Sequence, residues 1–95
     1  MNIVELTARE IAEKVKSREL SAREVLDAHL DHIKIVDGQS GKVGGDPNFE
    51  PDKVHAFINV TAERAKVQAD RVDMQIASGE NPGCLAGVPV TIKDI

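Results

Sequence analysis

Lys93 is the residue of this sequence best suited to chemistry, because of the segment that leads to it. Residues 88–92 read Val-Pro-Val-Thr-Ile, in which apolar residues alternate with others as they do in a β-strand. Such a strand is typical of a buried position, and open α/β sheets collect their ligands at the carboxyl ends of their strands. Burial disfavours the ammonium form, so a lysine at that end can act as a neutral base.

Two interpretations of Lys93 remain open from this pattern alone. The first is a catalytic residue that accepts a proton. The second is a lysine that leaves the sheet and pairs with Asp94 or with water, since charged residues are common at exposed strand ends. The role of Asp94 is open in the same way, because it could either orient Lys93 or close the strand.

Other residues that could do chemistry have weaker patterns around them. The glycine-rich stretch contains Gly-Lys at 41–42, but Val43 stands where a phosphate-binding loop needs Ser or Thr. His29 and His32 lie on one predicted helix without a third metal ligand, and His29 falls on its apolar face. Cys84 is the single cysteine, which excludes an intrachain disulfide. We therefore predict neither a metal site nor a cofactor-binding site in this chain.

Two helices near the N-terminus begin with the same signal. Thr7–Glu10 and Ser21–Glu24 each place a glutamate three positions after a hydroxyl residue, which is the pattern of a capping box. Apolar-face residues then recur at spacings of three and four. They are Ala8, Ile11, Ala12 and Val15 in the first helix and Ala22, Val25, Leu26, His29, Leu30 and Ile33 in the second. Because only residues 18–20 separate the helices, we predict an αα-hairpin.

The segments after the hairpin predict a loop and then a βαβ unit. Residues 37–52 contain four glycines and two prolines, which predicts a flexible loop. Residues 54–60 alternate as in a strand. Residues 62–78 carry alanines at helical spacing, with Thr61 as the predicted cap and Gly79 as the predicted stop.

Together with the final strand, this order predicts an α/β fold in which the αα-hairpin precedes a βαβ unit. Two parallel strands cannot form a covered sheet by themselves. We therefore expect residues 1–95 to be the first, incomplete part of a single larger domain.

The composition narrows the class of protein. Twelve Lys and Arg and 16 Asp and Glu give a net charge of −4, with both signs interspersed. The basic residues form no stripe, and the only aromatic residues are Phe49 and Phe57, so we expect no direct binding to nucleic acid. No apolar run approaches the ~20 residues of a membrane span, and Met1 is followed by polar, acidic sequence rather than a signal peptide. A cytoplasmic location without membrane contact is expected.

Several of these segments resemble the amidase-signature family of enzymes. The sequence LAGVPVTIKDI at 85–95 is similar to the motif with which that family introduces its catalytic lysine. Residues 54–60 are similar to its first core strand, and residues 62–78 to its alanine-rich helix. The segments LTAREIA at 6–12 and AHLDHI at 28–33 are similar to its opening hairpin. The last motif alone is moderately specific, but the ordered set covers nearly the whole chain.

The resemblance implies a mixed sheet covered by helices and a Ser–cis-Ser–Lys triad whose lysine is Lys93. A neutral lysine relays a proton through a bridging serine to a nucleophilic serine, which attacks an amide carbonyl and releases ammonia. No serine of this chain has the glycine-flanked context of that nucleophile; the four are Ser17, Ser21, Ser40 and Ser78. We therefore expect residues 1–95 to be inactive alone.

Within the family, the combination of segments is most similar to the glutaminase subunits of tRNA-dependent amidotransferases. The resemblance implies two partners, the B and C subunits of such an enzyme, and glutamine as substrate. The ammonia would pass to the B subunit, which would use ATP and Mg to amidate Glu-tRNA(Gln). The loop at 37–52 is longer than the usual link of the family. Two alternatives are a stand-alone amidase that hydrolyses small amides and a non-catalytic helical interaction module.

Overall fold

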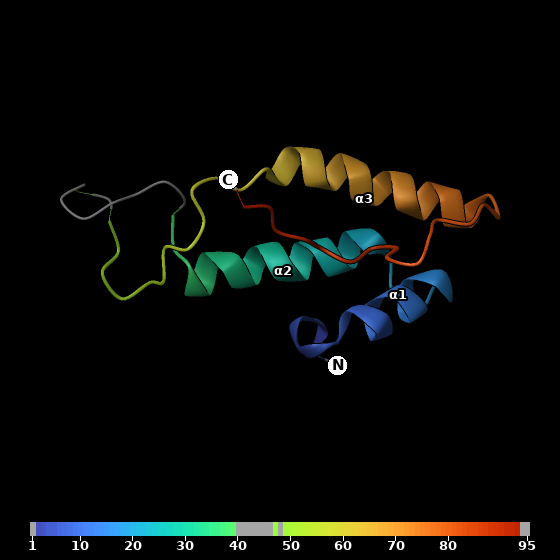
Figure 1. Cartoon of the computed structure of the whole chain (residues 1–95), viewed down its shortest axis with the longest axis horizontal. Helices are drawn as coiled ribbons and strands as arrows, with labels where there is room; N and C mark the ends of the chain where they lie inside the picture. The colour runs from blue at the N-terminus through green and yellow to red at the C-terminus, as the bar shows by residue number, and fades with distance from the viewer. Residues whose placement is uncertain (1, 40–46, 48, 94–95) are drawn as a thin grey trace.

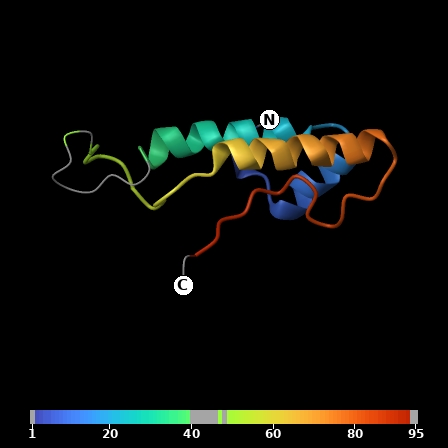
Figure 2. The same ribbon diagram turned by 90° about the horizontal axis from the view of Figure 1, so that it is seen from above.

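The computed structural model describes residues 2–39, 47 and 49–93. Its elements follow in the order η1 (Ile3–Glu5), α1 (Ala8–Lys16), α2 (Ala22–Val36) and α3 (Ala62–Ala77). The two longest helices, α2 and α3, lie side by side in opposite directions, in a molecule that measures 50 × 26 × 21 Å (Figure 1). Seen from above, α1 and the last segment of the chain lie on one side of this pair (Figure 2). None of the described helices is long and apolar enough to cross a membrane.

Local capping sets where α1 and α2 begin. The Thr7 hydroxyl accepts a hydrogen bond from the Glu10 N–H at 3.1 Å, and the Glu10 carboxylate accepts one from the Thr7 N–H at 2.9 Å. Ser21 and Glu24 form the same reciprocal pair at 3.0 and 3.4 Å. Hydrogen bonds from the Thr7 backbone and side chain hold the pKa of the Glu10 carboxyl below its ordinary value. Both predicted capping boxes, and the two helices that they start, are confirmed.

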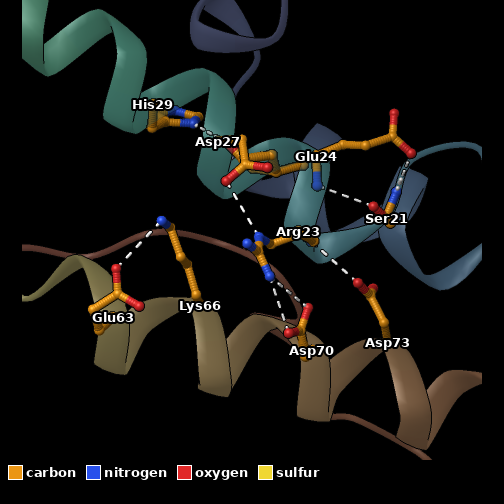
Figure 3. A network of polar contacts seen from close by, with 10 residues as sticks. Ser21, Arg23, Glu24, Asp27, His29, Glu63, Lys66, Asp70 and Asp73 are labelled. Carbon is orange, nitrogen blue, oxygen red and sulfur yellow. Dashed lines mark hydrogen bonds and ion pairs between the residues drawn. The ribbon is translucent and has the colours of Figure 1, made fainter.

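A side chain of α3 completes the capping of α2. The Asp73 carboxylate accepts hydrogen bonds from the backbone N–H groups of Ala22, at 2.6 Å, and Arg23, at 3.1 Å (Figure 3). The first N–H groups of a helix have no partner inside the helix, and a negative charge there is favourable to the helix dipole. Asp73 therefore joins the start of α2 to α3 by satisfying donors that α2 cannot satisfy itself.

Arg18 forms a second contact between the α1–α2 turn and α3. It lies in the turn between α1 and α2 with a φ of 65°, and its guanidinium donates to the Ile76 carbonyl of α3 at 2.9 Å. The same carbonyl accepts the N–H of Gly79 at 3.1 Å. Gly79 has a φ of 83°, the left-handed conformation in which many helices end, so the predicted stop of α3 is confirmed.

Asp73→Ala in the complete protein is expected to destabilise the start of α2 by about 1–2 kcal/mol, the usual loss for a helix cap. The matched control is Asp70→Ala on the same helix, which removes a partly exposed ion pair with Arg23 and is expected to have a smaller effect, because solvent screens such pairs. Hydrogen exchange of the amides at the start of α2, followed by mass spectrometry, measures both effects. Equal exchange rates in the two variants would contradict the capping role.

The hydrophobic core lies where α1, the start of α2 and the middle of α3 meet. Its buried residues are Ile11, Val15, Leu20, Ala22, Val25, Ala69 and Ala86. Val15 and Val25 are its largest fully enclosed side chains. From α3, Ala69 is the residue buried in this core, at 9% exposure.

Asp37 attaches the segment at 53–57 to the end of α2. The residue is only 4% exposed, and its carboxylate accepts hydrogen bonds from the N–H groups of Ala56 and Phe57, the latter at 3.2 Å. Its carbonyl oxygen accepts the N–H of His55 at 3.0 Å. Asp37 thus accepts hydrogen bonds from three backbone N–H groups of this segment. In the predicted sheet, these groups would have paired with a neighbouring strand.

The predicted βαβ unit is wrong, and with it the α/β fold class. The described residues form three α-helices and a short 3-10 helix, and no strand or sheet occurs among residues 2–39, 47 and 49–93. Alternation in residues 54–60 and 88–92 describes which way side chains face, but a strand exists only when its backbone pairs with another strand. Neither segment has such a neighbour in the described part of the chain. Four of their apolar residues are between 64 and 88% exposed; these are Val54, Ile58, Val90 and Ile92.

The predicted flexible loop at 37–52 is described only in part. Residues 40–46 and 48 lie outside the described residues, so its flexibility stays a prediction. At the start of the loop, Asp37 and Gly38 are buried. A hydrogen bond joins the described residues on either side of the gap, since the Glu50 carboxylate accepts the N–H of Gln39 at 3.2 Å.

Candidate functional site

The candidate site is the segment at 80–93, which carries Lys93. It begins at the end of α3, where the Glu80 N–H donates to the Gln75 carbonyl at 2.9 Å. The Asn81 side chain then accepts the N–H of Gly83 at 3.0 Å, which closes a local turn. The chain reverses there and runs back along the pair of α2 and α3, toward the start of α3 (Figure 1).

A tight turn at 84–87 fixes this segment to the core. The Val88 N–H donates to the Leu85 carbonyl at 3.1 Å, and Ala86 is 3% exposed. Gly87 has a φ of 75°, which glycine adopts without steric cost. Its backbone lies so close to α1 that an added Cβ would come within 2.7 Å of Val15 Cγ2.

Beyond the turn, Lys93 is exposed and has no hydrogen bond or ion pair with the described part of the chain. The expected burial of Lys93 at the end of a strand is therefore not observed. Asp94, its suggested partner, lies outside the described residues. The structure thus brings no second catalytic group to Lys93 within residues 2–39, 47 and 49–93, and its catalytic role stays a prediction.

A separate group of charged side chains lies between α2 and α3 (Figure 3). Arg23 donates to both oxygens of Asp70, at 3.0 and 3.2 Å, and to Asp27 at 3.3 Å. Hydrogen bonds to Asp70, and then to Asp27, raise the pKa of the Arg23 guanidinium above its ordinary value. Both carboxylates are about half exposed. This group links two helices and offers no unengaged acid or base.

A shallow cleft opens between the α1–α2 turn and the end of α3. Its lining residues are Val15, Arg18, Leu20, Ser21, Glu24, Asp73, Ile76 and Ala77. The polar groups among them are engaged in the capping contacts, Arg18 with α3 and Asp73 with α2. The cleft therefore belongs to the junction of the helices and presents no group aimed at a ligand.

The remaining sequence candidates have ordinary environments. The His29 ring donates through Nδ1 to the Val25 carbonyl at 2.8 Å, as expected for a histidine on the apolar side of a helix. His32 and Cys84 are exposed. Among the described residues, no group of three His, Cys, Asp or Glu side chains could hold a metal ion. The Gly-Lys pair at 41–42 lies outside them.

Three residues that join the helices or attach the segment at 80–93 to the core were not predicted as functional: Arg18, Asp73 and Gly87. Asp73 and Arg18 act on backbone groups 51 and 58 positions away, so no local pattern pointed to them. Gly87 directly precedes the strand-like pattern at 88–92, and nothing in that pattern indicated its close approach to α1. Its partner, Val15 on α1, had no signal beyond its apolar position.

Over nearly its whole length, the chain is similar to proteins of one class, the amidotransferase subunits. The chain is 46% identical over 95 residues to a protein of Streptomyces avermitilis, 43% over 94 residues to one of Corynebacterium diphtheriae and 45% over 94 residues to one of Carboxydothermus hydrogenoformans. These matches cover 100, 98 and 99% of this chain and 16% of each relative. No family model and no solved structure matches the chain.

The particular protein is the same in each case: all three relatives are named as the A subunit of glutamyl-tRNA(Gln) amidotransferase. The chain is similar to their N-terminal region and spans 16% of their length. The resemblance to a component of a tRNA-dependent amidotransferase, inferred from the sequence, is thereby confirmed. Since the name denotes one subunit among others, the relatives are parts of a multi-subunit amidotransferase.

Proposed function

We propose that this chain forms the N-terminal part of the glutaminase subunit of a tRNA-dependent amidotransferase. The complete subunit would hydrolyse glutamine and supply ammonia for converting Glu-tRNA(Gln) to Gln-tRNA(Gln). The observation that carries the proposal is the identity of 46% over all 95 residues with a relative named as the A subunit of glutamyl-tRNA(Gln) amidotransferase. The resemblance of residues 85–95 to the catalytic-lysine motif of amidase-signature enzymes supports the same function.

In this proposal, Lys93 is the base of a Ser–cis-Ser–Lys triad whose serines belong to residues outside this chain. The neutral Lys93 amine accepts a proton through the bridging serine, and the second serine forms a bond to the glutamine amide carbonyl. The C–N bond then breaks, and the proton goes to the departing nitrogen, which leaves as ammonia. Water hydrolyses the acyl-enzyme to glutamate and restores the serine.

Two features of the described structure support this role for Lys93. Its amine is not occupied by an ion pair with the described residues, so it is available to another group. The neighbouring Val90 and Ile92 side chains are 73 and 88% exposed, an apolar surface that further residues of a longer protein can cover. Burial by such residues would favour the neutral form of the lysine amine.

The partners follow from the same proposal. The B subunit would receive the ammonia and amidate Glu-tRNA(Gln), and ATP and Mg would be used there rather than by residues of this chain. The C subunit would hold the other two together. The location of the complex would be the cytoplasm, where tRNA is charged.

The test is the reaction of the complete protein with and without the B and C subunits. With both of them, ATP and glutamine, we expect Gln-tRNA(Gln) to form from Glu-tRNA(Gln), measured as radiolabelled aminoacyl-tRNA. The control replaces glutamine by ammonium chloride, which should support the reaction without the glutaminase. Rapid hydrolysis of small amides by the protein alone, without any Gln-tRNA(Gln) in the complete mixture, would show a stand-alone amidase instead.

A further inference from the structure

The Lys93 side chain is not held in place by contacts of its own. No residue of 89–93 makes a hydrogen bond or an ion pair with the described part of the chain. Lys93, Val90 and Ile92 are all exposed. The contacts that fix the direction of this segment within the described structure therefore lie before residue 90, since Pro89 is partly buried and residues 90–93 are exposed.

The last firm attachment before Lys93 is the contact between Gly87 and α1. A Cβ added at Gly87 would lie 2.7, 3.1 and 3.3 Å from Val15 Cγ2, Cγ1 and Cβ. Val15 is 1% exposed and cannot swing into solvent, because it is enclosed in the core. Ala86, next to Gly87, is itself a core residue at 3% exposure. The Gly87 backbone thus rests directly on a rigid part of α1.

Residues 88 and 89 are restricted in conformation, so the direction in which the chain leaves the turn at Gly87 affects the position of Lys93. Pro89 has a fixed φ, and its ring keeps Val88 out of the helical region. Val88 is also partly buried against the core. An extended chain from Gly87 to Lys93 spans at most about 20 Å, so a small rotation at Gly87 displaces the lysine by several ångströms.

We propose that Gly87 is a positioning residue for Lys93. Its close approach to Val15 sets where the segment leaves α1, and thereby where the Lys93 amine is presented. This inference rests on the proposed catalytic role of Lys93 for its effect on activity, but the placement of the segment can be measured independently.

The chain offers a matched control for Gly87 in Gly83. Both glycines have a positive φ, 75° at Gly87 and 92° at Gly83, so alanine is strained at either position. A Cβ at Gly83, however, would meet nothing within 4 Å. The comparison of Gly87→Ala with Gly83→Ala therefore isolates the contact with Val15 from the backbone strain.

In the complete protein, Gly87→Ala is expected to lower kcat for glutamine hydrolysis by ~10–100-fold with little change in KM, the effect of a catalytic group displaced by about 1 Å. Gly83→Ala is expected to stay within about twofold of the unchanged protein, since it leaves the attachment to α1 intact. Val15→Ala removes both Cγ atoms that the new methyl group would meet. The double variant V15A/G87A should therefore recover several-fold of the activity lost in G87A, and V15A/G83A is its control.

A distance measurement decides the placement without using catalysis. Spin labels at Lys16→Cys on α1 and Thr91→Cys on the segment, with the other cysteines replaced by serine, report their separation by pulsed electron resonance. We expect a shifted or broadened distance distribution with G87A and an unchanged one with G83A. If G87A alone fails to fold, V15A/G87A against V15A/G83A makes the same comparison.

Equal distance distributions in the glycine variants would overturn the positioning role, whatever the activities. Loss of kcat in G87A without rescue by V15A would also overturn it, because the Val15 contact would then not be the cause. If Lys93→Ala retained full activity, the proposed catalytic role would fail, while the distance measurement would still decide the role of Gly87.

Discussion

Lys93→Ala in the complete protein is expected to lower glutamine hydrolysis by ~10²–10⁴-fold, the range for the loss of a general base. The alanine side chain cannot accept the serine proton, so the nucleophile would stay in its unreactive form. The measurement is the rate of glutamate release at saturating glutamine. Lys16→Ala, a change at an exposed lysine on α1, serves as the control and is expected to have no measurable effect.

Lys93→Arg separates proton transfer from charge. A guanidinium keeps its proton under all accessible conditions and cannot act as a base, although it preserves a positive charge. We therefore expect Lys93→Arg to be nearly as inactive as Lys93→Ala. If Lys93→Arg kept near-normal glutaminase activity, Lys93 would be a structural cation and the proposed base would be wrong.

Ammonium distinguishes a catalytic Lys93 from a residue needed for folding or assembly. When the B and C subunits are present and ammonium replaces glutamine, the glutaminase step is bypassed. Formation of Gln-tRNA(Gln) is then expected to continue in both Lys93 variants. Loss of the ammonium-dependent reaction together with glutamine hydrolysis would indicate that Lys93 supports the structure of the complex instead.

Asp37→Ala is expected to release the segment at 53–57 from the end of α2. The change removes the acceptor of two backbone hydrogen bonds, from Ala56 and Phe57. Hydrogen bonds to a charged acceptor contribute about 1.5–3 kcal/mol each, and hydration of the freed N–H groups offsets part of the loss, so we expect about 2–4 kcal/mol. This corresponds to amide exchange that is roughly 30- to 700-fold faster at these residues, since 1.4 kcal/mol is a factor of ten.

Hydrogen exchange of the complete protein, followed by mass spectrometry on peptides that cover 53–60, tests this effect. Asp37→Asn keeps one acceptor oxygen and should lose about half of the stabilisation. Asp52→Ala is the matched control, because Asp52 is exposed and only pairs with Lys53 at 3.9 Å, so it should change exchange by less than about fivefold. If Asp37→Ala and Asp52→Ala gave the same exchange, Asp37 would not be the attachment.

The signals that start α1 and α2 were local ones, and those predictions were confirmed, whereas Thr61 precedes α3 without the side-chain capping hydrogen bond that was predicted for it. A capping box joins residues three positions apart, so Thr7 with Glu10 and Ser21 with Glu24 could be recognised without any knowledge of the fold. Gly79 ends α3 for a similar reason, since the left-handed conformation is a property of that residue and its immediate neighbours. The apolar faces of α1 and α2 were also visible in the spacing of their residues.

The strands were mispredicted because alternating apolar side chains do not by themselves make the backbone pair with another strand. Residues 54–60 and 88–92 have the period-2 pattern, but hydrogen bonds of a sheet come from a second strand that the pattern of one segment does not contain. Within the described structure, Ala56 and Phe57 donate to Asp37 instead, and residues 89–93 make no hydrogen bond with the described part of the chain. The burial expected for Lys93 depended on that sheet, which is why it is not seen.

The sequence by itself therefore determined where the helices begin, which faces they bury, and the similarity of the whole chain to the N-terminal region of an amidotransferase subunit. The tertiary structure decided which distant groups meet: Asp73 with the start of α2, Arg18 with the end of α3, and Gly87 with Val15. The physical reason is the separation along the sequence of the residues that interact. Hydrogen bonds within one helical turn are specified by neighbouring residues, whereas these contacts join positions 51 to 72 residues apart and exist only once α1, α2 and α3 have packed.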